Sequence, residues 1–172
     1  NIANVAWKQG DYLEARALLE DLLASAEEAG PDVAGDVFRA HNIHCNVLAA
    51  LGSAEKAAES CQKAIALGLK LLPPDHPEIA MMRLNLSQVL SEAGRFAEAL
   101  EIAVQATSVI TTKLPEGNPF RIQALLHEAL TRVNAGDLTN GLAIAQSAMH
   151  SAEQLLEKDH PVRVMAAMIL SN

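Results

Sequence analysis

Gly94-Arg95-Phe96-Ala97-Glu98-Ala99 decides the fold, because its first residue recurs along the chain at a fixed interval. The glycines at 10, 52, 94 and 136 stand 42 residues apart. Other positions keep the same step, which indicates a structural repeat rather than a chance spacing of glycines. The small and proline positions in register are Pro31, Pro73 and Pro115; Ala3, Cys45, Ser87 and Ala129; and Ala15, Ala57, Ala99 and Gly141.

Each repeat is predicted to contain two helices. From Ile79 onward apolar residues recur at every third or fourth position, which is the period of an amphipathic helix, and Gly94 stands where a C-terminal cap glycine is expected. Beyond Arg95 the same spacing continues to about Thr112. The small residues fall where one helix must approach its partner closely. The sequence therefore predicts an all-α protein of four antiparallel helix pairs followed by a lone helix.

Gly10-Asp-Tyr12-Leu-Glu-Ala15 and Gly94-Arg-Phe96-Ala-Glu-Ala99 resemble the signature of the tetratricopeptide repeat. The 42-residue step, against about 34 in the usual repeat, and the start Asp75-His76-Pro77 resemble the kinesin light chain subtype. The resemblance implies a right-handed α-solenoid and one array over residues 1–172. Its expected repeats span about 1–32, 33–75, 76–117 and 118–159, with a partial fifth repeat at 160–172.

Composition excludes several classes of partner. The net charge of -8 disfavours nucleic acid and anionic membranes, which require a clustered basic surface. No apolar run approaches the length of a membrane span. Cys45 and Cys61 fall at packing positions and are too few for a disulfide framework, so we expect reduced cysteines and a cytoplasmic protein. Because Asn1 falls inside a predicted helix, we also expect the chain to be a fragment of a longer protein.

The sequence carries no phosphate-binding loop, nucleophile elbow or zinc-protease motif, so we predict no enzyme activity, no catalytic residues and no cofactor. His41-Asn-Ile-His44-Cys45 places imidazole and thiolate groups on one helix face, a combination that suits zinc. These residues also occupy packing positions of the repeat, and we favour that structural interpretation over a metal site. The histidines before Pro77 and Pro161 recur with helix starts, which favours a structural role over a catalytic one.

The resemblance implies a concave surface formed by the first helix of each repeat. Amide side chains on this surface can both donate and accept hydrogen bonds, which suits an extended peptide backbone, and apolar residues beside them would take side chains of the peptide. The alternative is that the amides are merely solvated. The candidate partner-binding residues are Asn4, Lys8, Arg39, Asn42, Asn46, Met81, Leu84, Asn85, Gln88, Gln123, Leu126, His127 and Leu130.

Two functions follow as hypotheses. In the first, the array is a non-catalytic module that binds a protein or an extended peptide. In the second, it is a structural, oligomerisation or regulatory arm of a larger kinase- or ATPase-type protein. Self-association through the uncapped ends of the array is a further expectation, because a terminal repeat without a polar capping helix exposes apolar surface.

Overall fold

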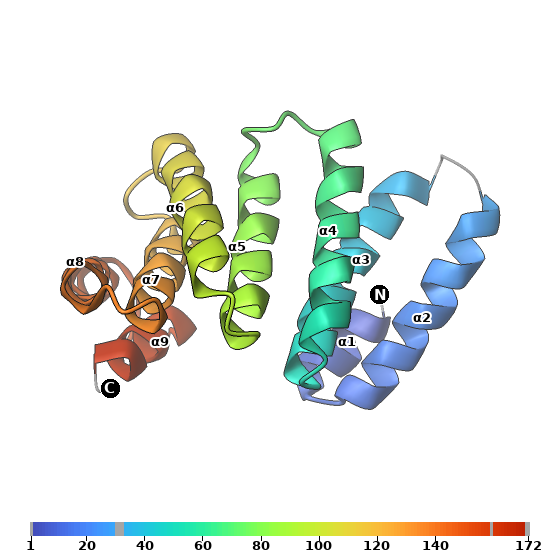
Figure 1. The fold of residues 1–172 in the computed structure, drawn as a ribbon, viewed down its shortest axis with the longest axis horizontal. Helices are drawn as coiled ribbons and strands as arrows, with labels where there is room; N and C mark the ends of the chain where they lie inside the picture. Colours follow the sequence, from blue (N-terminus) through green and yellow to red (C-terminus); the bar gives the residue numbers. More distant parts are fainter. Residues whose placement is uncertain (1, 30–32, 159, 171–172) are drawn as a thin grey trace. The chain divides into compact units, whose positions relative to one another are not determined.

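The computed structural model describes residues 2–29, 33–158 and 160–170, and every regular element in these ranges is a helix. The backbone forms two compact units, Asn1–Pro74 and Asp75–Asn172, called here the N-terminal and the C-terminal unit. Antiparallel pairs of helices stack within each unit (Figure 1). The elements are α1 (Ile2–Gln9), α2 (Tyr12–Ala29), α3 (Ala34–Ala50), α4 (Ala54–Leu71), α5 (Pro77–Glu92), α6 (Phe96–Lys113), α7 (Pro119–Asn134), α8 (Leu138–Leu155) and α9 (Pro161–Leu170). The predicted helix pairs and the lone last helix are confirmed for the described residues.

The repeating glycines end the first helix of each pair. Gly94 has a φ of +77°, a left-handed conformation that is strained for residues with a Cβ. Its N–H donates to the Ser91 carbonyl at 3.0 Å, and the Arg95 N–H donates to the Leu90 carbonyl at 2.8 Å. These two bonds make a Schellman motif, which satisfies carbonyls that the helix end leaves without partners. Gly10, Gly52 and Gly136 also have positive φ, so one backbone device makes all four turns.

Side chains ahead of proline begin the first helices of the C-terminal unit. His76 Nδ1 accepts from the Glu78 N–H at 3.2 Å, and Asn118 Oδ1 accepts from the Phe120 N–H at 2.9 Å. His160 Nδ1 accepts from the Val162 N–H at 3.3 Å. Each cap satisfies a donor that the helix start leaves unpaired, and the proline that follows has no N–H to satisfy. The structural role predicted for the two histidines therefore takes the form of helix capping.

Small buried residues bring the paired helices together. Ala15, Ala57 and Ala99 have no exposed surface, and Gly141 is buried at the equivalent place in α8. A Cβ on Gly141 would lie 2.8 Å from Val133 Cγ2 and 2.9 Å from the Ala129 carbonyl oxygen. The glycine is therefore the residue that lets α8 approach α7 this closely.

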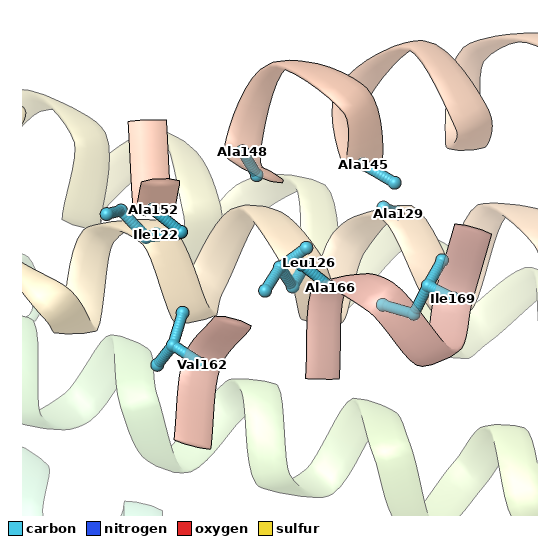
Figure 2. Packing of buried hydrophobic residues seen from close by; sticks show 9 residues of the cluster. All are labelled: Ile122, Leu126, Ala129, Ala145, Ala148, Ala152, Val162, Ala166 and Ile169. Atoms are coloured by element: carbon cyan, nitrogen blue, oxygen red, sulfur yellow. The ribbon is translucent and has the colours of Figure 1, made fainter. Parts of the chain in front are cut away.

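The packed interior of the C-terminal unit continues from these contacts into α9. Small residues of α8 face larger residues of α7 and α9, so the three helices share one apolar layer (Figure 2). Its buried members are Ile122, Leu126, Ala129, Ala145, Ala148, Ala152, Val162, Ala166 and Ile169.

A disulfide joins α3 to α4, and this corrects the expectation of two reduced cysteines. Cys45 and Cys61 are both buried, and their Cα atoms lie 5.2 Å apart. The two residues do occupy the predicted packing positions. The sequence did not indicate the bond, because which positions of two facing helices meet is decided by their packing.

We expect the double variant Cys45→Ala/Cys61→Ala to fold, because the equivalent residues of the α7–α8 pair are Ala129 and Ala145. Loss of the cross-link should lower the stability of the N-terminal unit by about 2–4 kcal/mol. Urea unfolding followed by circular dichroism, with and without dithiothreitol, measures this. The reductant should destabilise the wild type and leave the variant unchanged; equal sensitivity of both proteins would contradict the cross-link.

Gly141→Ala should destabilise the C-terminal unit by about 1–3 kcal/mol, the typical cost of overpacking. In an uncrowded helix the same change would stabilise by about 1 kcal/mol. Adding Val133→Ala should recover part of the loss, because it removes the 2.8 Å contact with Cγ2. Denaturant unfolding of the single and double variants, with the exposed Gln146→Ala as control, tests this. A Gly141→Ala protein as stable as the wild type would refute the close contact.

Candidate functional site

The first helices of the repeats in the C-terminal unit form one surface. Helix α5 packs beside α7, and α7 packs beside α9, so residues one repeat apart lie on neighbouring helices. We call the exposed side of these three helices the first-helix face. Asn85 of α5 and His127 of α7 occupy equivalent positions on it, as do Gln88 and Leu130. All four are exposed or half-buried.

A small polar hollow of about 70 Å³ lies on this face between α5 and α7. Gln88, His127, Leu130 and Asn134 line it, together with Ser91, Glu92 and Thr131. Asn134 Nδ2 donates to Ser91 Oγ at 3.0 Å, and Gln88 Nε2 donates to Glu92 Oε1 at 3.1 Å. Burial lowers the pKa of His127 below its ordinary value of 6.5, so its imidazole is neutral at pH 7. Apart from the Glu92 carboxylate, which accepts from Gln88, the hollow therefore offers uncharged donors and acceptors.

A larger hollow of about 480 Å³ lies between the starts of α7 and α9. Its lining is mostly apolar and includes Phe120, Val162 and Met165, with Gln123 and His160 as polar members. The Phe120 side chain is 57% exposed, which is unusual for a residue of its size. An exposed aromatic ring beside an apolar hollow is a feature typical of surfaces that bind protein side chains.

The other predicted contacts lie in the N-terminal unit or outside the described side chains. Arg39 of α3 is exposed and pairs with Asp36 across 3.6 Å. Asn42 and Asn46 are half-buried on the same helix. The side chains of Asn4 and Lys8 are not among those that the structure describes. Met81 of α5 and Gln123 of α7 are half-buried at equivalent positions in the C-terminal unit.

Comparison with known proteins identifies the repeats. A tetratricopeptide repeat model matches residues 1–70, and a second model of this repeat matches residues 36–111. The chain belongs to the tetratricopeptide repeat family. No curated protein matches the sequence of this array.

Solved structures similar to this tetratricopeptide array are of the kinesin light chain type. A Podosopora anserina protein, described as a kinesin light chain with nearly identical TPR-like repeats, has a TM-score of 0.79 at 19% identity over 99% of this chain and 81% of its own. A single-substitution variant of that protein has a TM-score of 0.80 at 19% identity over 99% and 80%. BtubC (BKLC) from P. vanneervenii has a TM-score of 0.79 at 16% identity over 98% and 67%. Identities this low relate the folds alone.

Two residues predicted for the binding surface of the array are buried instead. Leu84 is 1% exposed and packs in a cluster with Ala103 of α6 and Ala124 of α7. Leu126 has no exposed surface and lies in the layer shared by α7, α8 and α9 (Figure 2). The predicted stripe was too wide, because these positions of the first helix point between the neighbouring helices. Neither residue is available to a partner.

The sequence analysis missed other residues of the first-helix face. Phe120, Asn134 and Met165 line the two hollows but were not predicted. The repeat step could have found Met165, because it stands 42 residues after Gln123. Phe120 gave no signal of this kind, since the equivalent residue of the preceding repeat is Glu78.

The His41-Asn-Ile-His44-Cys45 motif, whose spacing would suit zinc, packs α3 against α4. The sulfur of Cys45 is bonded to Cys61, and the imidazoles of His41 and His44 both contact Ser60 of α4. Within the described ranges no group of three or more His, Cys, Asp or Glu side chains is arranged to hold a metal ion. None of the helices in those ranges has the length and apolar character needed to cross a membrane.

The depressed pKa of His127 predicts a dependence of stability on pH. As the pH falls through 6.5, the unfolded chain binds a proton that the folded chain resists, so the free energy of unfolding should fall. The slope for one such group is at most about 1.4 kcal/mol per pH unit. His127→Asn, which copies Asn85 of the preceding repeat, should reduce this loss between pH 7.5 and pH 5.5. Urea unfolding of both proteins measures it, and identical pH profiles would exclude the effect.

Proposed function

We propose that this array is a non-catalytic protein-interaction module that binds an extended peptide or a partner protein on the first-helix face. Tetratricopeptide repeats generally serve as protein-interaction modules, and stacked repeats provide extended binding surfaces. The observation that carries the proposal is the presence of a polar and an apolar hollow on the same layer of helices, with α7 lining both. A peptide lying across α7 would contact both hollows.

The chemistry of the two hollows suggests how a peptide would be held. Gln88 and Asn134 carry amides that can pair with backbone N–H and C=O groups of any sequence. Phe120 and Met165 would bury an apolar side chain of the partner. Met81, Asn85 and Gln123 remain proposed contacts on this face, and Arg39, Asn42 and Asn46 remain proposed contacts on α3. The net charge of -8 favours a protein partner over nucleic acid or an anionic membrane.

A second candidate function is that of an oligomerisation or regulatory arm. The exposed apolar residues of α9 favour it, because Val164 is 54% exposed and Met168 is 64% exposed. Such residues on one helix are a surface for self-association. Sedimentation of the chain at increasing concentration separates the two candidate functions. If the wild type forms an oligomer and the Val164→Glu/Met168→Glu variant does not, the result supports an oligomerisation arm.

For the location, the acidic composition and the absence of a disulfide framework favoured the cytoplasm. The Cys45–Cys61 disulfide is the observation against it, because disulfides persist mainly in oxidising compartments. Labelling of cysteine thiols in intact cells decides between the cytoplasm and an oxidising compartment. A fully alkylated protein places the chain in a reducing compartment, and an unlabelled one places it in an oxidising compartment.

The partner can be found by photo-crosslinking from the proposed surface. Benzoylphenylalanine in place of Gln123 should capture a protein, whereas the same group at Glu101, an exposed residue of α6, should not. Mass spectrometry of the crosslinked product then gives the peptide that binds. Capture only from Glu101 would move the interaction to the second helices of the repeats.

Titration of that peptide tests the contacts. Gln88→Ala should weaken binding by about tenfold, because a lost hydrogen bond that leaves its partner group unsatisfied costs about 1–3 kcal/mol. Phe120→Ala should weaken it by a similar factor through lost apolar burial. Both side chains are exposed, so the fold should be retained. The affinity should change little between low and high salt, since Gln88 and Phe120, the two main contacts, are uncharged. If both variants bind like the wild type while Glu101→Ala does not, the first-helix face is not the binding surface.

A further inference from the structure

The polar hollow of the first-helix face lies where α5 and α7 end. Ser91 and Glu92 belong to the last turn of α5, and Thr131 and Asn134 belong to the last turn of α7. The C-terminal end of a helix carries a partial negative charge, which favours a cation nearby. Two helix ends of this kind therefore border the hollow.

Glu92 adds a full negative charge at a place where helices disfavour one. The neighbouring helices α6 and α7 carry Lys113 and Arg132 in their last turns, whereas the last turn of α5 has no basic residue. Lys113 pairs with Asp75, and Arg132 pairs with Glu128 at 2.8 Å. The Glu92 carboxylate therefore opposes the dipole of its own helix.

The repeat does not require an acidic residue at this position. Ala50 and Asn134 stand 42 residues before and after Glu92. The Gln88 amide, an uncharged donor, lies 3.1 Å from its carboxylate, and no lysine, arginine or histidine of the described ranges forms an ion pair with it. A local preference that is broken without compensation is expected mainly at functional sites.

The buried imidazole of His127 also lines the hollow. Its backbone carbonyl accepts from Thr131 Oγ1 at 2.9 Å, but no side chain in the part of the chain that the structure describes bonds to the ring. The ring is uncharged at pH 7 and has one acceptor nitrogen in either tautomer. It therefore does not repel a bound cation.

The size of the hollow limits what can enter it. Its volume of about 70 Å³ is far below the roughly 300–1,000 Å³ of pockets that hold whole small molecules, so it admits only the end of one chain. Its acceptors are the Glu92 carboxylate and the amide oxygens of Gln88 and Asn134, whose NH₂ groups donate to Glu92 and Ser91. A primary ammonium matches them, because it is compact and carries three donors and no acceptor.

We propose that the polar hollow binds a primary ammonium group of the peptide partner, either the side chain of a lysine or the N-terminus of the peptide. This assignment rests on the proposed binding of an extended peptide to the first-helix face. The ammonium donates to Glu92 and to the amide oxygens beside it. Since a single ion pair at an exposed carboxylate contributes modestly, the affinity still depends mainly on the uncharged contacts and changes little with salt.

The separation of the two hollows sets the place of the ammonium in the peptide. Phe120 in the apolar hollow and Leu130 in the polar hollow lie about 15 Å apart along α7, since each helical residue rises about 1.5 Å. An extended peptide advances about 3.3 Å per residue, so it covers this distance in about five residues. The partner should therefore carry an apolar residue about five positions from the lysine or from its N-terminus.

Two histidines report on the hollows separately, because His127 lines the polar one and His160 lines the apolar one. NMR of the whole chain with isotope-labelled histidine follows both imidazoles, and the variants His127→Asn and His160→Asn assign their signals. The probe is an acetylated and amidated peptide of a leucine, four serines and a lysine. Its match has norleucine, which lacks the ammonium, in place of the lysine. We expect the lysine peptide to shift both imidazoles and to bind at least threefold more tightly than its match.

A second pair of peptides separates the two sources of the ammonium. One begins with a free N-terminal norleucine, followed by four serines and a leucine, and the other is its acetylated form. A larger gain in affinity from the free N-terminus than from the lysine assigns the hollow to a peptide N-terminus. A larger gain from the lysine assigns it to a side chain.

Glu92→Gln should abolish the preference for the ammonium, whereas Glu101→Gln should keep it. The two variants are matched, because the exposed Glu101 carboxylate accepts from the Gln105 amide at 3.3 Å, as Glu92 accepts from Gln88 at 3.1 Å. Glu92→Gln should also be at least as stable as the wild type in urea, since its charge opposes the helix dipole. A less stable Glu92→Gln protein would show a structural role and overturn the assignment.

The assignment is also overturned if neither ammonium peptide binds more tightly than its match, or if Glu92→Gln keeps the preference. Peptides that shift His160 but leave His127 unchanged overturn it too, while peptide binding to the first-helix face stands. If neither imidazole shifts, the ammonium site is excluded, and photo-crosslinking from Gln123 decides separately whether this face binds a protein.

Discussion

The close approach of the two helices in each pair is the constraint on which the rest of this structure depends. It requires a residue no larger than alanine in the second helix, and Ala57 and Ala99 meet that requirement with no exposed surface. In α8 the neighbouring Val133 is larger than its counterpart Ser91, and Gly141 takes the place of the alanine. The larger side chain on α7 is therefore matched by a smaller residue on α8, so the two helices stay equally close. Such compensation is expected because protein interiors are packed as densely as organic crystals.

Tight pairing also shapes the surface that we propose binds a partner. Because small residues fill the helix contacts, larger side chains such as Phe120 and Met165 line hollows between neighbouring first helices. The polar residues in the unit interiors have identifiable partners: Ser87 donates to the Ala99 carbonyl at 2.8 Å, and Arg132 bridges Glu128 and Asp137 at 2.8 Å each. Two buried nitrogens of the N-terminal unit differ: Arg16 Nε and His44 Nε2 have no hydrogen-bond partner among the described residues, and each lies 3.9 Å from Glu20 Oε1.

Most of the fold could be predicted, but of the fourteen residues that line the two hollows only four were predicted: Gln88, Gln123, His127 and Leu130. The glycine turns and proline-flanked caps depend on residues within one turn of the helix end, so their sequence pattern is sufficient. Gln88 and His127 were found because repeat register places them on adjacent helices. The prediction that Leu84 and Leu126 are exposed was wrong, because the periodicity of one helix does not show how much of its surface the neighbouring helices cover. Phe120 was missed because its repeat equivalent is a different type of residue.

The sequence by itself determined the repeat length, the helix pairs, their turns and caps, and the small contact positions. These features follow from local backbone preferences and from the 42-residue spacing of equivalent residues in the sequence. Only the tertiary structure decided that Cys45 meets Cys61, that Leu126 is covered by α8 and α9, and that Glu20 lies beside His44. Each of those outcomes depends on the rotation and depth at which one helix packs on another. Periodicity gives the face of a helix, whereas the neighbouring side chains decide what that face contacts.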